Sequence, residues 1–236
     1  MNEQVSDWVS FWDQPHSIYV NARHVDVHYR DIADAIIGFV PRPNAHVMDY
    51  ACGEAIYAGE VAQHVERLLL CEAGQNVRAK LIQRFRANPK IQVLAPEDLA
   101  GLPRESLDLI VANSLMQYLP SEELDRLLGV WCNLLKPDGV LIIGDVIPPD
   151  AGAVSDVVAL LGYAAKNRFL LAALAGLVRT VASPYRKLRS QIGIACYGER
   201  EFLGRLGAAG FTAERLPFNL EHNSKRMSFR ATKTAA

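Results

Sequence analysis

A run of small residues follows a short apolar segment near position 50, and these residues carry the clearest chemical signal in the chain. Asp49 lies at the end of the apolar segment, and Ala51, Gly53 and Ala55 follow at alternate positions. Small residues allow a ligand to approach the backbone closely. Glu72 lies nineteen residues after Gly53, at the end of the next apolar run, where a carboxylate can accept both hydroxyls of a ribose. The pattern therefore predicts a binding site for a nucleoside-containing ligand.

Apolar runs and helical segments alternate along the chain, and they would position these residues. We expect helices over 1–40, 54–64, 75–87, 121–135 and 199–209, and strands over 45–50, 65–71, 91–95, 107–112, 140–146, 211–217 and 227–232. Ser121 is expected to cap its helix, and residues 136–139 are expected to form a turn. This order favours an α/β fold with helices on both faces of a mostly parallel sheet.

Three segments follow from this division of the chain. Residues 1–40 are expected to form an N-terminal helical lid segment, in which Trp12 and Tyr19 fold over the site. Residues 41–150 and 193–236 form the core, and the apolar segment 151–192 is a helical cap inserted in the same domain. The basic residues of this cap are compatible with an enclosing lid or with contact to an anionic membrane surface.

The turn after position 50 resembles the first motif of class I S-adenosylmethionine-dependent methyltransferases of the small-molecule type. That motif has an acidic residue, a hydrophobic residue and then G-C-G-x-G, and residues 49–55 match it with alanine at both outer glycines. Residues 96–103, 106–113 and 134–141 resemble the later motifs of the family, in the same order. The resemblance implies a Rossmann-like, seven-stranded mixed sheet whose last strand is antiparallel, and S-adenosylmethionine as the cofactor.

The same resemblance implies which residues bind the cofactor: Asp49, Ala51, Gly53, Glu72, Asp98, Leu99 and Asn113. Asp98 would accept a hydrogen bond from the adenine amino group, and the N–H of Leu99 would donate to a ring nitrogen. In-line methyl transfer from a sulfonium requires alignment of the reactants and exclusion of water. A base is needed only where the acceptor loses a proton, and Tyr19, Gln117 and His222 are the candidates on the acceptor side.

Composition narrows the choice of partners. The formal net charge is −1, which gives no bulk attraction to nucleic acid. No two of the four cysteines have CxxC spacing, which favours reduced thiols. No secretory signal and no apolar run long enough to span a membrane are visible, so we expect a cytoplasmic protein, with peripheral membrane contact still open. We expect a small-molecule acceptor of apolar or anionic character; the methylated atom and the oligomeric state are left open.

Other functions remain open at this point. The altered glycine turn is compatible with a catalytically inactive module that binds adenosylmethionine for a binding or scaffolding role. A nicotinamide oxidoreductase would need the third glycine of G-x-G-x-x-G, which is missing here. A protein or RNA methyltransferase is a further alternative. His24 and His28 have the spacing of a metal pair, but the residues between them do not match the zinc-binding H-E-x-x-H helix, so no metal is expected.

Overall fold

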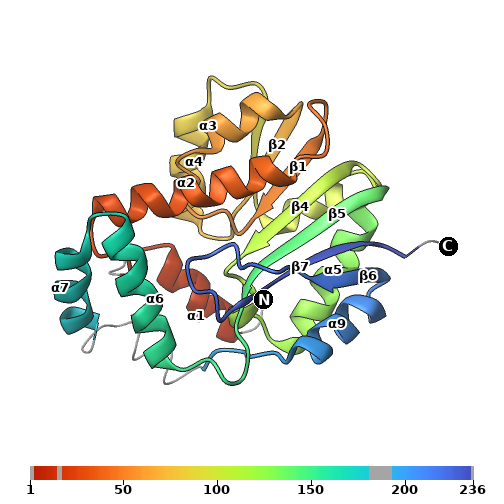
Figure 1. Cartoon of the computed structure of the whole chain (residues 1–236). Coiled ribbons are helices and arrows are strands. Elements are labelled where there is room, and N and C mark those ends of the chain that lie inside the picture. The colour runs from red at the N-terminus through yellow and green to blue at the C-terminus, as the bar shows by residue number, and fades with distance from the viewer. Residues whose placement is uncertain (1–2, 15–17, 181–192, 235–236) are drawn as a thin grey trace.

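The computed structural model describes residues 3–14, 18–180 and 193–234, and a seven-stranded sheet of order β3-β2-β1-β4-β5-β7-β6 lies at its centre (Figure 1). The strands are β1 (His46–Tyr50), β2 (Arg67–Cys71), β3 (Ile91–Leu94), β4 (Leu107–Asn113), β5 (Leu135–Val146), β6 (Phe211–Arg215) and β7 (Met227–Lys233). β7 pairs antiparallel with both β5 and β6, whereas the other neighbouring strands pair in parallel. The expected mixed sheet with an antiparallel last strand is confirmed.

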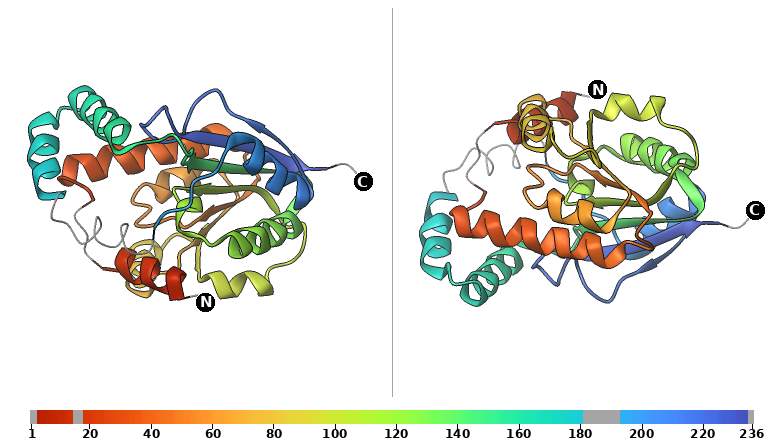
Figure 2. Two further views of the ribbon diagram at one scale, coloured as in Figure 1. Left: turned by 90° about the horizontal axis from the view of Figure 1, so that it is seen from below. Right: turned by 90° about the horizontal axis from the view of Figure 1, so that it is seen from above.

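Helices cover both faces of this sheet (Figure 2). The helices α2 (Ala22–Phe39), α3 (Ala58–Val61) and α4 (Gln75–Phe85) cover one face, and α5 (Ser121–Leu134) and α9 (Glu199–Ala208) cover the other. Successive side chains of a strand point to opposite faces, so Val111 of β4 packs in the α2 core and Ile110 packs in the α5 core. Burial on both faces explains why the central parallel strands β1, β2 and β4 are rich in apolar residues.

The first forty residues differ from the expectation, because they contain two helices. α1 (Glu3–Trp12) ends well before α2, and Asn21 caps the second helix: its side chain accepts a hydrogen bond from the backbone N–H of His24 at 2.9 Å. A side-chain oxygen at this position satisfies a donor that the first helical turn leaves free. Because this N-cap lies within residues 1–40, a second helix begins there, at Ala22.

Three local expectations were wrong. Residues 54–64 hold only the short α3 and the 3₁₀ turn Ala62–His64, because the left-handed backbone at Ala55 is incompatible with an α-helix. Ser121 does not cap α5, since it is already the first helical residue and Pro120 occupies the cap position. Residues 136–139 belong to β5, which begins with the pairing of Leu135 to Leu107.

Two apolar helices follow β5, in the segment that the sequence analysis assigns to the cap. α6 (Ala153–Lys166) and α7 (Leu170–Thr180) pack against the side of α2 through a small core of Val27, Ala164, Phe169 and Ala173. Figures 1 and 2 show both helices beside the N-terminal half of α2. Residues 181–192 of the expected cap lie outside the described residues. None of the described helices combines the length and the hydropathy needed to cross a membrane.

Candidate active site

A cavity of about 770 Å³ lies at the carboxyl ends of the central strands. Its walls come from the loop after β1, the ends of β2, β4 and β5, the loop between β6 and β7, and the helices α1, α2 and α6. The sheet order reverses between β1 and β4, which is where open α/β sheets bind ligands. A volume of this size accommodates a nucleoside together with a second small molecule.

The loop after β1 forms one wall and has a left-handed backbone at three alternate positions. The φ angles are 60° at Ala51, 56° at Gly53 and 38° at Ala55. Glycine is the residue that adopts this conformation without strain. A Cβ atom on Gly53 would lie 2.7 Å from the hydroxyl oxygen of Tyr29, so a side chain there would displace this hydroxyl. The two alanines hold a conformation that favours glycine, at a cost of roughly 1 kcal/mol each.

We expect the double substitution Ala51→Gly and Ala55→Gly to raise the free energy of unfolding by about 1 kcal/mol. Relief of the left-handed strain exceeds the added conformational entropy of glycine in the unfolded chain. A shift of the melting temperature by roughly 2–4 °C would report it. Ala79→Gly, on the exposed side of α4, is the matched control and should destabilise by about 1 kcal/mol. If the double variant and Ala79→Gly lower the free energy of unfolding equally, the two alanines are not strained.

Glu72, at the carboxyl end of β2, is fixed against this loop. The N–H of Gly53 donates to its Oε2 at 2.9 Å, and the N–H of Gly74 donates to its Oε1 at 2.8 Å. Burial raises the pKa of the Glu72 carboxyl, and the hydrogen bonds from Gly74 and Gly53 act in the opposite direction. Each carboxylate oxygen keeps a further acceptor site. The predicted pairing of an acid with the small-residue turn is therefore present.

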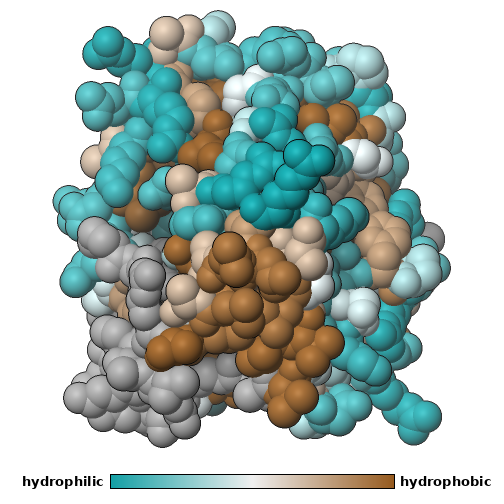
Figure 3. Space-filling model, turned by 60° about the vertical axis from the view of Figure 1, so that its left-hand side comes forward, coloured by the Kyte–Doolittle hydropathy of each residue, from teal (hydrophilic) through white to brown (hydrophobic). Residues whose placement is uncertain are grey.

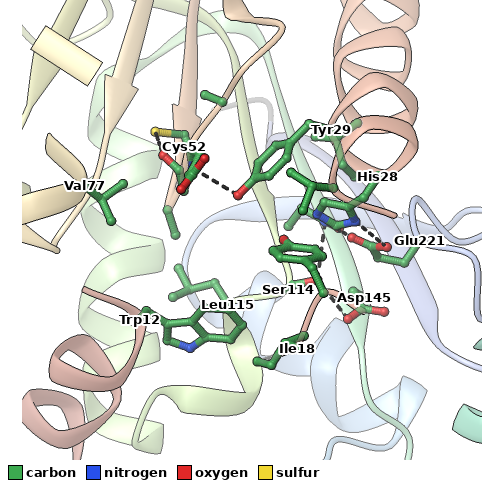
Figure 4. A pocket seen from close by; sticks show the side chains of 18 of the residues that line it. Trp12, Ile18, His28, Tyr29, Cys52, Val77, Ser114, Leu115, Asp145 and Glu221 are labelled. Atoms are coloured by element: carbon green, nitrogen blue, oxygen red, sulfur yellow. Dashed lines mark hydrogen bonds and ion pairs between the residues drawn. The ribbon is translucent and has the colours of Figure 1, made fainter. Parts of the chain in front are cut away.

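Asp49 and Tyr29 lie on either side of the same loop. Asp49 is 7% exposed, and burial raises its pKa to about 7, with a smaller contribution from the charge of Glu72. Tyr29 projects from α2 toward the loop, and its hydroxyl oxygen accepts the N–H of Glu54 at 3.0 Å (Figure 4). Burial raises the pKa of Tyr29 to about 12, so the hydroxyl keeps its proton at neutral pH.

Two amide side chains line the cavity beyond β4. The Nδ2 of Asn113 donates to Glu221 Oε1 at 2.8 Å, and the Nε2 of Gln117 donates to the carbonyl oxygen of Ser114 at 2.9 Å. Asn113 Oδ1 and Gln117 Oε1 are buried, and no residue in the described part of the chain donates to either. Buried acceptors usually have a donor, so these two oxygens are exceptions among the described residues.

A cluster of imidazoles surrounds one buried carboxylate on the opposite wall. His28 Nδ1 lies 3.4 Å from Glu221 Oε2 (Figure 4). His222 Nδ1 lies 3.6 Å from the same oxygen. Burial lowers the pKa of His28, but the Glu221 charge and hydrogen bond outweigh burial and raise it overall. Burial, followed by the charges of His28 and His222, lowers the pKa of His24 to about 4. The sequence analysis considered His28 only as a metal ligand. It did not identify Glu221, although Glu221 directly precedes His222, a candidate on the acceptor side.

A second ionic network joins β5 to the cap. Arg226 donates to Asp145 Oδ2 at 2.6 Å and to Asp156 Oδ1 at 3.0 Å, and Asn223 donates to the same Asp156 oxygen at 2.8 Å. Ser114 donates to Asp145 at 2.9 Å. These contacts tie α6 to the sheet edge. Sequence reasoning missed them, because neither Arg226 nor Asp145 belongs to a recognisable motif.

Most of the residues that the sequence nominated do line this cavity: Asp49, Ala51, Gly53, Glu72, Asn113, Tyr19, Gln117 and His222. Asp98 and Leu99 do not appear in its lining. The side chain of the exposed Asp98 accepts the N–H of Ala95 at 2.8 Å and so caps the start of the 3₁₀ helix Pro96–Gly101. Leu99 is buried in the α5 core. The proposed contacts of these two residues with adenine stay a prediction.

Comparison with known proteins agrees with this geometry. Residues 48–143 match the family model of a methyltransferase domain. A 122-residue stretch is 28% identical to a probable non-canonical nonribosomal peptide synthetase of Salinispora arenicola, and it covers 50% of this chain but only 2% of that protein. The chain thus spans a small part of that relative.

Two solved methyltransferases share the fold. Phosphoethanolamine N-methyltransferase 1 of Haemonchus contortus, solved with phosphoethanolamine and S-adenosylhomocysteine, has a TM-score of 0.52 at 21% identity, over 63% of this chain and 34% of that one. Magnesium protoporphyrin IX methyltransferase of Synechocystis, solved with S-adenosylhomocysteine, has a TM-score of 0.60 at 16% identity, over 99% and 96% of the two chains. Together with the strand order and the loop after β1, the matching domain model and these structures show that the chain has a Rossmann-like methyltransferase fold.

Proposed function

We propose that this protein transfers the methyl group of S-adenosylmethionine to a small molecule held in the same cavity. The observation that carries the proposal is the pairing of Glu72 with the N–H of Gly53 beside a 770 Å³ cavity. Two similar structures are named for methylation of small molecules, phosphoethanolamine and magnesium protoporphyrin IX. S-adenosylmethionine supplies an electrophilic methyl group on a sulfonium. The residues of the chain align it with the acceptor and exclude water.

The charge of the cavity supports a cationic ligand. The acids of its lining outnumber the lysines and arginines; the acids are Asp13, Asp49, Glu54, Glu72, Asp145, Asp156 and Glu221, and the bases are Lys80 and Arg226. A cleft with this excess of negative charge attracts cations. The sulfonium and the ammonium group of adenosylmethionine are both cationic and fit this field.

The same charge bears on the acceptor. Much of the remaining lining is aliphatic or aromatic, with Ile32, Leu115, Leu160 and Leu177 among its members. An anionic acceptor would have to enter a site that already holds a surplus of carboxylates. We therefore favour an apolar acceptor that is neutral or cationic over the anionic alternative.

The N-terminal segment serves as a lid in this proposal. Trp12, Asp13 and Tyr19 line the cavity, and Asp13 Oδ1 accepts the backbone N–H of Asn76 at 2.7 Å and of Val77 at 3.1 Å. These contacts cap the first turn of α4 from outside the helix. They hold the end of α1 next to Glu72, where the lid excludes water from the adenosyl half of the site.

His28 is the base of the proposed reaction. In its neutral form, an imidazole whose Nδ1–H faces Glu221 presents an unprotonated Nε2 as the acceptor of a proton. As the acceptor atom attacks the methyl carbon, the carbon–sulfur bond breaks, its electron pair stays on sulfur, and the acceptor proton passes to His28. Two catalytic candidates from sequence lie near this histidine: the Tyr19 ring is 5.2 Å from the His28 ring, and His222 Nδ1 faces the same Glu221 oxygen.

We expect cofactor binding near pH 7 to release a proton from Asp49. Burial holds its pKa at about 7, so roughly half of the molecules carry the proton, and a bound cation lowers that pKa. Titration calorimetry in buffers of different ionisation enthalpy would show a buffer-dependent heat at pH 6.5–7 but not at pH 9. Asp49→Asn should remove the dependence, and Asp108→Asn, at the other end of the sheet, should not. A buffer-independent heat in the parent protein would count against this linkage.

Binding and turnover together test the function. Calorimetry should show 1:1 binding of S-adenosylmethionine, and release of S-adenosylhomocysteine should depend on an added acceptor from a panel of apolar phenols and amines. Tight binding without turnover on any acceptor or cell extract would favour the inactive binding module instead. Quenching or enhancement of nicotinamide fluorescence, with no adenosylmethionine binding, would favour an oxidoreductase.

A further inference from the structure

The outer face of the cap carries most of the exposed apolar surface of the described residues. Six of their eight exposed large apolar side chains lie on α6 and α7: Val154, Val158, Leu170, Leu171, Leu174 and Val178. We call this set the cap face. Val154, Val158, Leu171 and Val178 are between 64% and 83% exposed. Figure 3 shows a contiguous apolar patch on this side of the molecule.

The cap face is distinct from the side of the helices that packs on the protein. Val157, Leu160 and Leu177 line the cavity, and Ala164, Phe169 and Ala173 pack on α2. These inward residues make the contacts that hold α6 and α7 on the rest of the protein. The spacing of Val154 and Val158 on α6, and of Leu171, Leu174 and Val178 on α7, places each set along one helical stripe. A second apolar stripe on the outside indicates a further surface to which the cap binds.

The charges of the cap identify the kind of surface. Residues 151–198 contain six lysines and arginines and one acid, Asp156. Asp156 accepts hydrogen bonds from Asn223 and Arg226, on the cavity side. Lys166 and Arg168 are exposed where α6 gives way to α7, while Arg179 and the basic residues of 181–192 have side chains outside the described set. An apolar helix face bordered by cations is the pattern of interfacial helices on anionic bilayers.

We propose that the cap face docks the protein on an anionic lipid surface, with the aliphatic side chains in the acyl boundary and Lys166 and Arg168 at the headgroups. A second copy of the chain fits less well, because a two-fold contact would bring the same cations together. A protein partner also fits less well, because protein hot spots are rich in Trp, Tyr and Arg and poor in Leu and Val. The proposal does not depend on the methyl acceptor.

Vesicle co-sedimentation tests this docking with the full chain. We expect it to sediment with vesicles of phosphatidylcholine and phosphatidylserine, to stay in solution with phosphatidylcholine alone, and to be released by salt. The double variant Leu171→Gln/Val178→Gln should bind about 100-fold more weakly, from two lost apolar contacts. The matched control is Ile82→Gln, whose side chain is 57% exposed on α4 and which should bind as the parent does.

Two results would overturn the proposal. One is equal sedimentation of the parent and the double variant, at equal melting temperature. The other is absence of binding to the anionic vesicles. If light scattering then shows a dimer that the double variant dissociates, the cap face is an interface between copies. Weaker binding by the double variant, with unchanged melting and a monomer throughout, supports lipid docking.

Discussion

Glu72→Gln is expected to weaken binding of S-adenosylmethionine by roughly 100-fold or more, because hydrogen bonds from two ribose hydroxyls to a charged oxygen contribute about 1.5–3 kcal/mol each. The carboxylate has a second task in this protein. Its two oxygens accept the N–H groups of Gly53 and Gly74, and the amide of glutamine would turn a donor toward one of them. The loop after β1 would then lose part of its support, so the loss of affinity should exceed that of a ribose contact alone. Titration calorimetry measures it.

Glu66→Gln is the matched control for this change. Glu66 is exposed, directly before β2, at the opposite end of the strand that carries Glu72. The Glu66→Gln variant loses the same charge far from the cavity. Its affinity for S-adenosylmethionine should equal that of the parent protein. Circular dichroism must show a folded chain in both variants. A folded Glu72→Gln protein that binds the cofactor within about threefold of the parent would refute the adenosyl site.

The sheet could be predicted from sequence because its parallel strands are buried on both faces. β1, β2 and β4 are mostly apolar, with Asp49 and Asp108 as buried exceptions, and such runs between turn signals identify strands. The late start of the helix after β1, at Ala58 instead of residue 54, could not be predicted. Ala51 and Ala55 are good helix formers by propensity, yet the loop holds both in a left-handed conformation. That conformation depends on Glu72 and Tyr29, which contact the loop from elsewhere in the chain.

The candidate site was predictable only in its cofactor half. Asp49, Gly53 and Glu72 belong to adjacent strand ends, so their proximity follows from strand order. The acceptor half assembles from residues far apart in the sequence. His28 and Glu221 meet across 193 positions, and neither belongs to a motif. Contacts of this kind depend on how α2 and the β6–β7 loop pack, which a single sequence does not encode locally.

The pair of His28 and Glu221 should set the pH dependence of the reaction. Burial lowers the pKa of His28, but the charge of Glu221 and its hydrogen bond, with smaller effects of Asp145 and Asp31, raise it above the ordinary 6.5. His28 must be neutral to accept a proton, so kcat should rise with pH through this raised pKa. Glu221→Gln removes the partner that raises it, and the midpoint of the profile should move to lower pH. The groups that face this pair are His24, His222, Tyr19, Tyr29 and Arg226.

Removal of the imidazole should have the largest effect on turnover. General base catalysis contributes about 100-fold to 10,000-fold, so His28→Gln should lower kcat by about 100-fold or more and leave cofactor affinity nearly unchanged. His64→Gln, an exposed histidine in the 3₁₀ turn after α3, is the control and should keep full activity. Proton NMR of the imidazoles offers a readout without an acceptor: His28 should titrate above 6.5 in the parent and lower in Glu221→Gln.

Stability follows the same linkage. Because the pKa of His28 is raised in the folded protein, its ion pair with Glu221 stabilises fully below about pH 6.5, and this contribution is lost as pH rises through the folded pKa. Glu221→Gln should therefore lower the melting temperature more at pH 6 than at pH 9. An equal loss at both values, together with an unshifted His28 titration, would mean that the two side chains meet without sharing charge. In that case His28 would have no carboxylate to orient it, and Tyr19 or His222 would become the stronger candidate for the base.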